Sequence, residues 1–186
     1  MRKMITVKIN GEERQYPQGA TYEDVANDYQ QEYENLIALA ARDGKIRELF
    51  KKLTRDCEVT FFTLKDDVGN KTYVRSATML FLKAVFDVYG REAAQSCRVE
   101  FAIGNGSYIS PKGKINATEE NAAKIRNRMR ELVEAKTPFL KRSYSLDNAM
   151  ELFRKEGMKD KEKLFRYRRG SFVNIYEMDG YYDYYY

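Results

Sequence analysis

Residues 4–24 read MITVKINGEERQYPQGATYED and predict the opening of the fold. Apolar and polar residues alternate over residues 4–9, which is the pattern of a half-buried strand. The pair Asn10-Gly11 favours the tight two-residue turn of a β-hairpin. Residues 14–16 predict the return strand, which stops at Pro17. The stretch therefore predicts a β-hairpin at the start of a sheet.

A helix is predicted to begin directly after this hairpin. Thr21 and Asp24 have the spacing of a capping box, in which each side chain bonds the backbone N–H of the other residue. Apolar residues then recur at helical spacing and predict a buried stripe of Tyr22, Val25, Ala26 and Tyr29. Further strands are predicted at residues 36–41 and 57–64, and a short strand or irregular segment at residues 45–50. Hairpin, capped helix and further strands follow the order of a β-grasp domain, which we assign to residues 1–65.

A second domain is predicted over residues 70–186, after a polar connection at residues 66–71 that contains Gly69. Residues 74–89 predict a helix that is apolar on most sides and is therefore expected to be buried, with Leu80 at its centre. The remaining elements are strands at 98–103 and 107–109 around the turn Gly104-Asn105-Gly106, helices capped by Thr118 and Ser145, and a last strand at 172–176. Both domains mix helices and strands, so the predicted fold class is α+β.

The composition excludes several classes of catalytic site. The 186 residues include no histidine, and the two cysteines, Cys57 and Cys97, lie far apart in the sequence. Ser-His and Cys-His catalysis and histidine- or cysteine-rich zinc sites are therefore excluded, and we expect no metal. No apolar run approaches the roughly 18 residues that cross a bilayer, and the first residues lack a signal-peptide pattern. We expect a cytoplasmic protein without a membrane partner.

Three stretches resemble the N-terminal half of threonyl-tRNA synthetase. Residues 74–81 (VRSATMLF) lie where the synthetases have His-Ser-x-x-His-Leu-Leu. Residues 102–108 (AIGNGSY) resemble their Ile-Gly…Asn-Gly-Phe-Tyr strand turn, and residues 145–157 resemble their Ser-x-x-x-Ala-x-x-x-Phe-x-x-x-Gly helix. The resemblance implies a TGS domain, which is a β-grasp module, followed by the editing-like domain that threonyl- and alanyl-tRNA synthetases share. This second domain would lack its last strands.

The metal-binding residues of that family are replaced in this chain. The family's His-x-x-x-His positions correspond to Arg75 and Met79, and its Cys-x-x-x-His positions correspond to Tyr176 and Gly180. A guanidinium group is always protonated and cannot serve as a zinc ligand. The resemblance therefore implies the editing fold without metal-assisted hydrolysis of mischarged tRNA.

These four positions form instead a candidate ligand-binding cleft. Arg75 is expected to be buried there, within about 10–12 Å of Tyr176. It would either bind an anion bidentately or form a structural salt bridge, because buried charges are usually paired. Glu177 and Asp179 are the expected acidic partners.

The tail of the chain resembles a second family. Residues 173–182 (VNIYEMDGYY) are similar to the sequences of bacterial uridine-kinase-like proteins. In those proteins the same two domains precede a P-loop phosphotransferase domain. The chain has no Gly-x-x-x-x-Gly-Lys-Ser/Thr motif, so we expect no kinase activity from it and no cofactor in it. The resemblance implies a fragment that ends at Tyr186, with the downstream kinase domain as its partner. ATP and Mg²⁺ would bind to that domain.

Basic residues provide a further candidate site. Arg166, Tyr167, Arg168 and Arg169 interleave charge with an aromatic ring, as in surfaces that bind RNA or phosphate, although a surface loop is the competing interpretation. The basic run at residues 124–130 spreads around its helix and predicts a solvated face. Three functions follow: a non-catalytic auxiliary module of a nucleoside kinase that binds a small molecule, a tRNA- or RNA-binding module, or a divergent aminoacyl-tRNA hydrolase.

Overall fold

The computed structural model describes residues 3–104 and 106–185. The chain divides into two compact units, Met1–Ser76 and Ala77–Tyr186, which we call unit 1 and unit 2. Both units combine helices with antiparallel strand pairs, so the predicted α+β class is confirmed. The domain boundaries at residues 65 and 70 stay a prediction.

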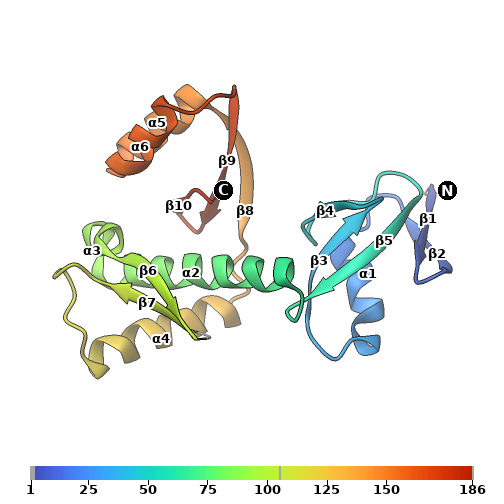
Figure 1. Ribbon diagram of the computed structural model, residues 1–186, viewed down its shortest axis with the longest axis horizontal. Helices are drawn as coiled ribbons and strands as arrows, with labels where there is room; N and C mark the ends of the chain where they lie inside the picture. The colour runs from blue at the N-terminus through green and yellow to red at the C-terminus, as the bar shows by residue number, and fades with distance from the viewer. Residues whose placement is uncertain (1–2, 105, 186) are drawn as a thin grey trace. The chain divides into compact units, whose positions relative to one another are not determined.

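Unit 1 is a five-stranded mixed sheet with one helix against it (Figure 1). The strand order is β2-β1-β5-β3-β4, in which β1 and β5 are parallel and the other pairs are antiparallel. Along the chain, a hairpin, a helix and further strands follow one another, as expected from the sequence for a β-grasp domain. The elements are β1 (Met4–Ile9), β2 (Glu12–Pro17), α1 (Tyr22–Tyr29), η1 (Gln30–Glu32), β3 (Ile37–Arg42), β4 (Lys45–Arg47) and β5 (Cys57–Thr63).

Local chemistry explains the start of unit 1. Asn10 and Gly11 both have positive φ, 51° and 88°, as the tight hairpin turn requires. Thr21 and Asp24 form the predicted capping box: the Thr21 hydroxyl accepts from the Asp24 N–H, and the Asp24 carboxylate accepts from the Thr21 N–H. All four residues of the predicted α1 stripe are buried against the inward side chains of β1, which are Ile5, Val7 and Ile9.

The polar connection predicted at residues 66–71 is helical from Asp67 onward, because it forms the start of α2 (Asp67–Tyr89). The Asp66 carbonyl accepts from the Asn70 N–H at 2.8 Å, so the helical hydrogen bonds begin among these polar residues. Gly69 is needed there because a Cβ atom on it would lie 2.0 Å from the Thr63 carbonyl oxygen. In the sequence this glycine indicates a connection between domains, whereas in the structure it permits close packing.

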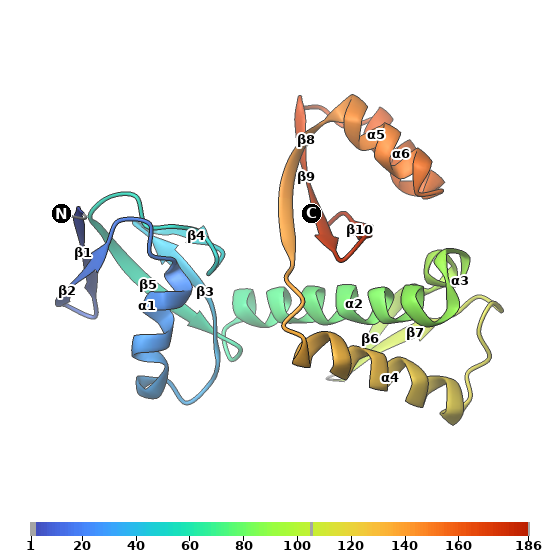
Figure 2. The ribbon, with the colours of Figure 1, turned by 180° about the vertical axis from the view of Figure 1, so that it is seen from behind.

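Unit 2 contains the C-terminal part of α2, two small sheets and four further helices among the residues that the structure describes (Figure 2). One sheet has the order β10-β9-β8, and the other is the hairpin β6-β7. The elements are α3 (Arg91–Ser96), β6 (Arg98–Ile103), β7 (Gly106–Ser110), α4 (Glu119–Glu134), β8 (Leu140–Ser145), α5 (Leu146–Lys155), α6 (Lys159–Arg166), β9 (Phe172–Met178) and β10 (Tyr181–Asp183). Asn105, in the predicted turn between β6 and β7, lies outside the described residues.

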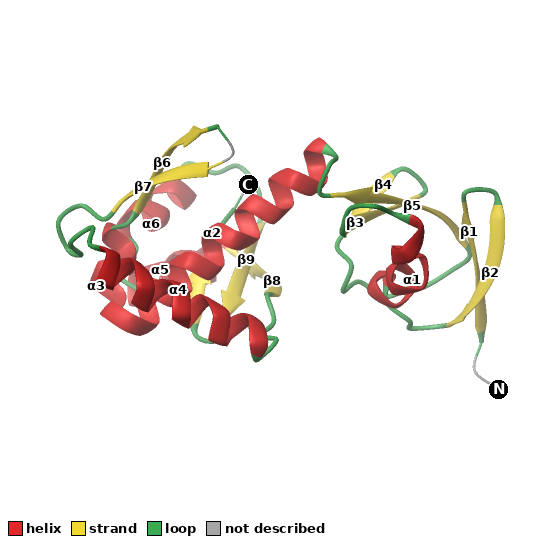
Figure 3. Cartoon of the chain, turned by 90° about the horizontal axis from the view of Figure 1, so that it is seen from below, coloured by secondary structure: helices red, strands yellow, loops and turns green. Residues whose placement is uncertain are grey.

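Two apolar clusters fill unit 2. The first joins α2 and α4, which lie side by side in Figures 1 and 2, to the β9–β10 hairpin through Met79, Leu132 and Tyr181. The second joins the paired helices α5 and α6, seen in Figure 3, to β9 through Phe153, Phe165 and Ile175. Thr118 and Ser145 cap α4 and α5 as predicted, each accepting a hydrogen bond from an N–H three residues later.

Some predicted positions differ from those observed. In α4, Leu132 is 2% exposed and packs in the first apolar cluster, whereas the neighbouring Val133 is 60% exposed. Leu80, expected at the buried centre of its helix, is half-buried. Cys57 and Cys97 are free thiols. Over residues 3–104 and 106–185, no helix is long and apolar enough to cross a membrane.

Candidate functional site

The four positions of the predicted cleft have different environments. Arg75 lies in the part of α2 that belongs to unit 1, whereas Met79, Tyr176 and Gly180 belong to unit 2. Met79 is 1% exposed and packs in the first apolar cluster of unit 2, where Tyr176 is half-buried. Gly180 has φ 80° in the β9–β10 turn, so its role here is conformational. The convergence of all four residues stays a prediction.

Arg75 differs from its predicted environment, because its side chain is exposed. The carboxylates proposed as its partners contact other cations. Glu177 lies 3.5 Å from the Arg142 guanidinium, and the Asp179 carboxylate lies 3.2 Å from the Lys83 ammonium group. An exposed guanidinium is satisfied by water, so the expectation that Arg75 needs a buried acidic partner is wrong.

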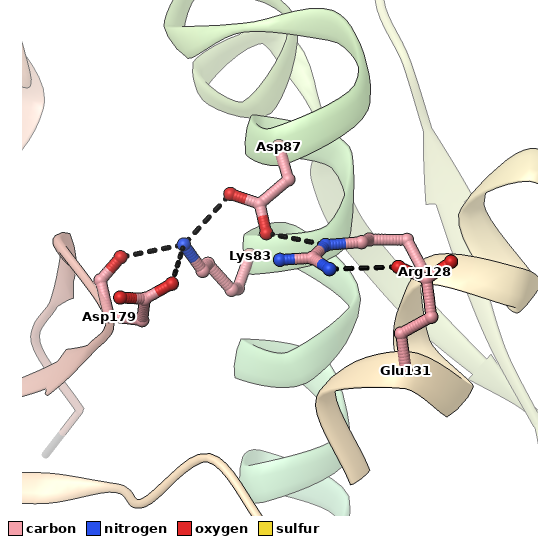
Figure 4. Close-up of polar contacts among 5 residues, drawn as sticks. All are labelled: Lys83, Asp87, Arg128, Glu131 and Asp179. Atoms are coloured by element: carbon pink, nitrogen blue, oxygen red, sulfur yellow. Dashed lines mark hydrogen bonds and ion pairs between the residues drawn. The ribbon is translucent and has the colours of Figure 1, made fainter. Parts of the chain in front are cut away.

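Lys83 is a buried cation that holds the β9–β10 turn against α2 (Figure 4). Its ammonium group donates to the Asp87 carboxylate at 2.8 Å and to the Asp179 carbonyl oxygen at 2.6 Å. Asp87 also accepts from the Arg128 Nε at 2.9 Å, which extends the network to α4, and Arg128 donates to Glu131 at 2.8 Å. Such a buried charge is tolerated because several hydrogen bonds satisfy it. Sequence analysis missed this network.

A second group of buried polar side chains lies where α6 meets the C-terminal hairpin of unit 2. Asp183 is 2% exposed, forms an ion pair with Lys161 and accepts from the Tyr184 N–H at 2.6 Å. The Tyr181 hydroxyl donates to the same carboxylate at 3.4 Å. The Lys161 ammonium group lies 6.0 Å from the centre of the Tyr185 ring. We call these four residues, Lys161, Tyr181, Asp183 and Tyr185, the Lys161–Asp183 cluster.

The electrostatics of this cluster are unusual for the chain. Burial lowers the pKa of Lys161 to about 8, whereas its contact with the Asp183 carboxylate acts in the opposite direction and favours the ammonium form. Burial also raises the pKa of Tyr185, so its phenol stays protonated. The Tyr185 hydroxyl is buried and has no hydrogen-bond partner among the described residues. Perturbed groups of this kind gather at functional sites, and an unpartnered hydroxyl can donate to a ligand.

One sequence signal could have revealed the Lys161–Asp183 cluster. Asp183 is an acidic residue inside a run of tyrosines, and a charge in an apolar run is normally paired. Its partner, Lys161, lies in α6, whose eight residues are mostly charged and gave no apolar stripe. The pairing could not be predicted because the two residues are distant in the sequence.

The predicted RNA contacts lie at the end of α6. Arg166 closes that helix and contacts Glu162 at 3.2 Å, while Arg168 donates to the Tyr184 hydroxyl. Tyr167 is 87% exposed, and Arg169 is exposed too. The residues therefore form an exposed basic and aromatic surface whose guanidinium groups are partly engaged within the chain. Whether this surface contacts RNA stays a prediction.

The basic run in α4 is largely paired. Lys124 contacts Glu120 at 2.6 Å, and Arg126 contacts Glu119 at 3.3 Å. Arg128 belongs to the Lys83 network. Pairing along a helix surface agrees with the interpretation of α4 as a solvated face. Among the described residues, no group of three or more cysteine, aspartate or glutamate side chains could hold a metal ion.

Comparison with known proteins gives one consistent relationship. A threonine–tRNA ligase of Thermotoga neapolitana is 27% identical over 187 residues, which cover 93% of this chain. The ligase of Thermotoga maritima is 27% identical over 186 residues, 92% of the chain, and that of Syntrophotalea carbinolica is 31% identical over 153 residues, 74% of the chain. The chain is therefore similar to a part of threonine–tRNA ligases. No protein-family model matches it.

The likeness covers part of each ligase. The chain spans 28% of the Thermotoga neapolitana and Thermotoga maritima ligases and 23% of the Syntrophotalea carbinolica ligase. The predicted resemblance to threonyl-tRNA synthetase is thus confirmed. The resemblance to uridine-kinase-like proteins and the TGS assignment of unit 1 stay predictions.

Proposed function

We propose that the chain is a non-catalytic module that binds a small ligand at the Lys161–Asp183 cluster. One observation carries the first half of this proposal: Met79 is 1% exposed in an apolar core, at a position where the synthetase resemblance implies a metal ligand. A buried thioether, with an exposed guanidinium one helical turn earlier at Arg75, does not provide the imidazole pair that would hold a metal-bound hydroxide. The replacement favours binding without metal-assisted hydrolysis.

The Lys161–Asp183 cluster supports the second half. Lys161 is 29% exposed in its side chain, so its ammonium group can reach a ligand while Asp183 holds it in place. The Tyr185 hydroxyl offers a further donor that the chain leaves without a partner among its described residues. A cation beside a phenol suits a polar ligand with acceptor oxygens, such as a nucleoside.

Calorimetric titration with uridine tests this proposal. The wild-type chain is expected to bind uridine, and Lys161→Met is expected to weaken that binding at least tenfold. Lys163→Met, on the same helix but exposed, serves as the matched control and should leave the affinity unchanged. Equal uridine binding by all three proteins would place the site elsewhere, and no binding by the wild type would remove the proposal. Turnover of seryl-tRNA by the pure chain would contradict the non-catalytic assignment.

The finer proposal is that the module serves a uridine-kinase-like protein. The likeness of residues 173–182 to that family supports it, and the P-loop domain of such a protein would carry ATP and Mg²⁺. A polypeptide that extends beyond residue 186 in the genomic reading frame is expected to phosphorylate uridine with ATP, whereas the present chain is not. Lack of a P-loop sequence in that reading frame would end this part of the proposal.

A second candidate function is tRNA binding, favoured by the likeness to threonine–tRNA ligases. Tyr167 presents an exposed ring between basic residues, and such rings stack on bases. Filter binding of tRNA at rising salt tests it: the logarithm of the association constant should fall linearly with the logarithm of salt concentration. Arg169→Gln should make that dependence shallower, while Arg55→Gln on unit 1, paired with Asp43, should not. Absence of binding at low salt would exclude this function.

A further inference from the structure

Unit 1 contains a basic pocket of about 530 Å³, formed between α1, the end of β3 and the loop that follows β4. Its lining carries four cations, Arg42, Arg47, Lys51 and Lys52, against one described carboxylate, that of Glu48. A concave site lined by one sign of charge concentrates ions of the opposite sign. The volume lies in the range of about 300–1,000 Å³ that is typical of small-molecule sites.

Backbone hydrogen bonds hold the wall of this pocket in place. The loop after β4 accepts from the first turn of α1: the Tyr22 N–H donates to the Lys51 carbonyl at 3.0 Å, and the Glu23 N–H donates to the Leu49 carbonyl at 2.8 Å. The Leu53 N–H donates back to the Ala20 carbonyl at 2.7 Å. The basic loop is therefore fixed to a capped helix, and the pocket needs little ordering when a ligand arrives.

The floor of the pocket carries an unused donor. Tyr22 is fully buried, and its hydroxyl proton has no acceptor within the described part of the chain. Burial raises the pKa of Tyr22, and the nearby Arg42 guanidinium offsets part of that rise. The phenol stays protonated at neutral pH and can donate to an anion held by Arg42. A buried hydroxyl without a partner is costly unless a ligand or water satisfies it.

The rim of the pocket carries an aromatic face. Phe50 is 43% exposed, and the Lys51 ammonium group lies 5.0 Å from the centre of its ring. An exposed ring next to cations can stack a base while the cations hold a phosphate. Arg42 is oriented by a hydrogen bond of 3.1 Å to the Thr54 hydroxyl.

From these features we propose that this pocket binds a nucleoside 5′-monophosphate group. Arg42 and Lys51 contact the phosphate, the Tyr22 hydroxyl donates to one of its oxygens, and Phe50 stacks on the base. The same group occurs as a free nucleotide and at the 5′-phosphorylated end of an RNA strand. This site lies in unit 1 and does not depend on the Lys161–Asp183 cluster of unit 2.

Titration of the whole chain with uridine 5′-monophosphate, uridine and inorganic phosphate tests this inference. The monophosphate should bind at least tenfold more tightly than either of the other two compounds, because it engages both the cations and the ring. Arg42→Gln and Lys51→Gln should each weaken its binding about fivefold to tenfold. Tyr22→Phe should weaken it severalfold while the thermal midpoint changes little, since the hydroxyl proton has no acceptor to lose.

Matched controls separate this site from other sites in the chain. Asn27→Ala alters the neighbouring pocket of unit 1, of about 710 Å³, and should leave the affinity for the monophosphate unchanged. Lys161→Met should also leave it unchanged, even if it abolishes uridine binding to unit 2. Loss of monophosphate binding in Lys161→Met, with full binding in Arg42→Gln and Lys51→Gln, would overturn the inference.

Two further comparisons identify the natural source of the group. A short 5′-phosphorylated RNA that binds more tightly than the monophosphate, and loses this advantage with a 5′-hydroxyl, would identify an RNA end. Equal or weaker binding of the RNA would identify the free nucleotide. Phosphate that binds as tightly as the monophosphate would show that Phe50 has no role and would contradict the nucleotide assignment.

Discussion

Lys83 and Asp179 lie 96 positions apart in the sequence, and the Lys83 ammonium group contacts Asp179 through both its carbonyl oxygen, at 2.6 Å, and its carboxylate, at 3.2 Å. The Lys83 side chain is 3% exposed and that of Asp179 is 65% exposed. The buried Lys83 on α2 thus holds the turn that contains Asp179, although the Asp179 side chain itself is largely exposed. The contact anchors the β9–β10 hairpin to α2, the helix that carries Met79.

Replacement of Lys83 by methionine is therefore expected to destabilise unit 2. The substitution keeps the volume but leaves the Asp87 carboxylate with Arg128 alone, so we expect a loss near the lower end of about 3–5 kcal/mol. Urea unfolding followed by circular dichroism measures it. Lys124→Met, which removes an exposed ion pair with Glu120, is the control and should change little. Equal midpoints for the two variants would show that the Lys83 network contributes nothing to stability.

Gly69→Ala is expected to destabilise unit 1 although alanine favours helices. A methyl group at this position would lie 2.0 Å from the Thr63 carbonyl oxygen, so the backbone must move, at a cost of about 1–3 kcal/mol. Asn70→Ala, at the next and exposed position of α2, is the control and should be neutral or stabilising. A gain in thermal stability for Gly69→Ala would mean that α2 begins later in the chain than described.

Alanine substitutions at Leu82 and Leu80 test which side of α2 is buried. The sequence pattern placed Leu80 at the buried centre, with an expected loss of about 2–5 kcal/mol on replacement by alanine. Leu82 is 8% exposed whereas Leu80 is half-buried, so this range now applies to Leu82→Ala, and Leu80→Ala should cost less. Chemical denaturation of both variants gives the comparison, and the reverse order would restore the original assignment.

Tyr16 is expected to make stability fall at high pH. Burial, followed by the hydrogen bond to Asp28, raises its pKa from 10.0 to about 12. Between these values the unfolded chain releases the phenol proton and the folded chain retains it, so the contribution is complete below pH 10 and is lost as pH rises toward 12. The stability difference between wild type and Tyr16→Phe, measured by urea unfolding from pH 8 to 11.5, should be constant up to pH 10 and then shrink. A difference that stays constant throughout would contradict this pKa.

Local signals predicted unit 1 well because its elements are specified by neighbouring residues. The Asn10-Gly11 turn and the Thr21–Asp24 box each act over three residues or fewer, and the α1 stripe repeats at a fixed period. The polar start of α2 was missed because its decisive contact, between Gly69 and Thr63, is tertiary. The charge-rich helix α6 was missed because Phe165 is its only buried residue. A single apolar residue cannot show the periodic spacing that predicts a helix.

The candidate sites were harder to predict, since they depend on pairs that are distant in the sequence. Arg75 was expected to be buried because its helix is apolar overall, yet Arg75 and the two residues before it, Tyr73 and Val74, are exposed. Lys83, Lys161 and Asp183 are ordinary residue types whose burial only the fold reveals. The synthetase resemblance is confirmed by the comparison with known ligases, while the proximity of Arg75 to Tyr176 stays a prediction.

The tyrosine-rich end of unit 2 has a consequence for how that unit unfolds. Tyr181 packs in the first apolar cluster and Tyr184 in the second, only three residues away on the same hairpin. Each cluster buries one side chain of this short segment. We therefore expect that opening of one cluster also disrupts the other. Amide protons of β9 should therefore exchange with solvent deuterium at a common slow rate with those of α2 and α5, as one cooperative unit.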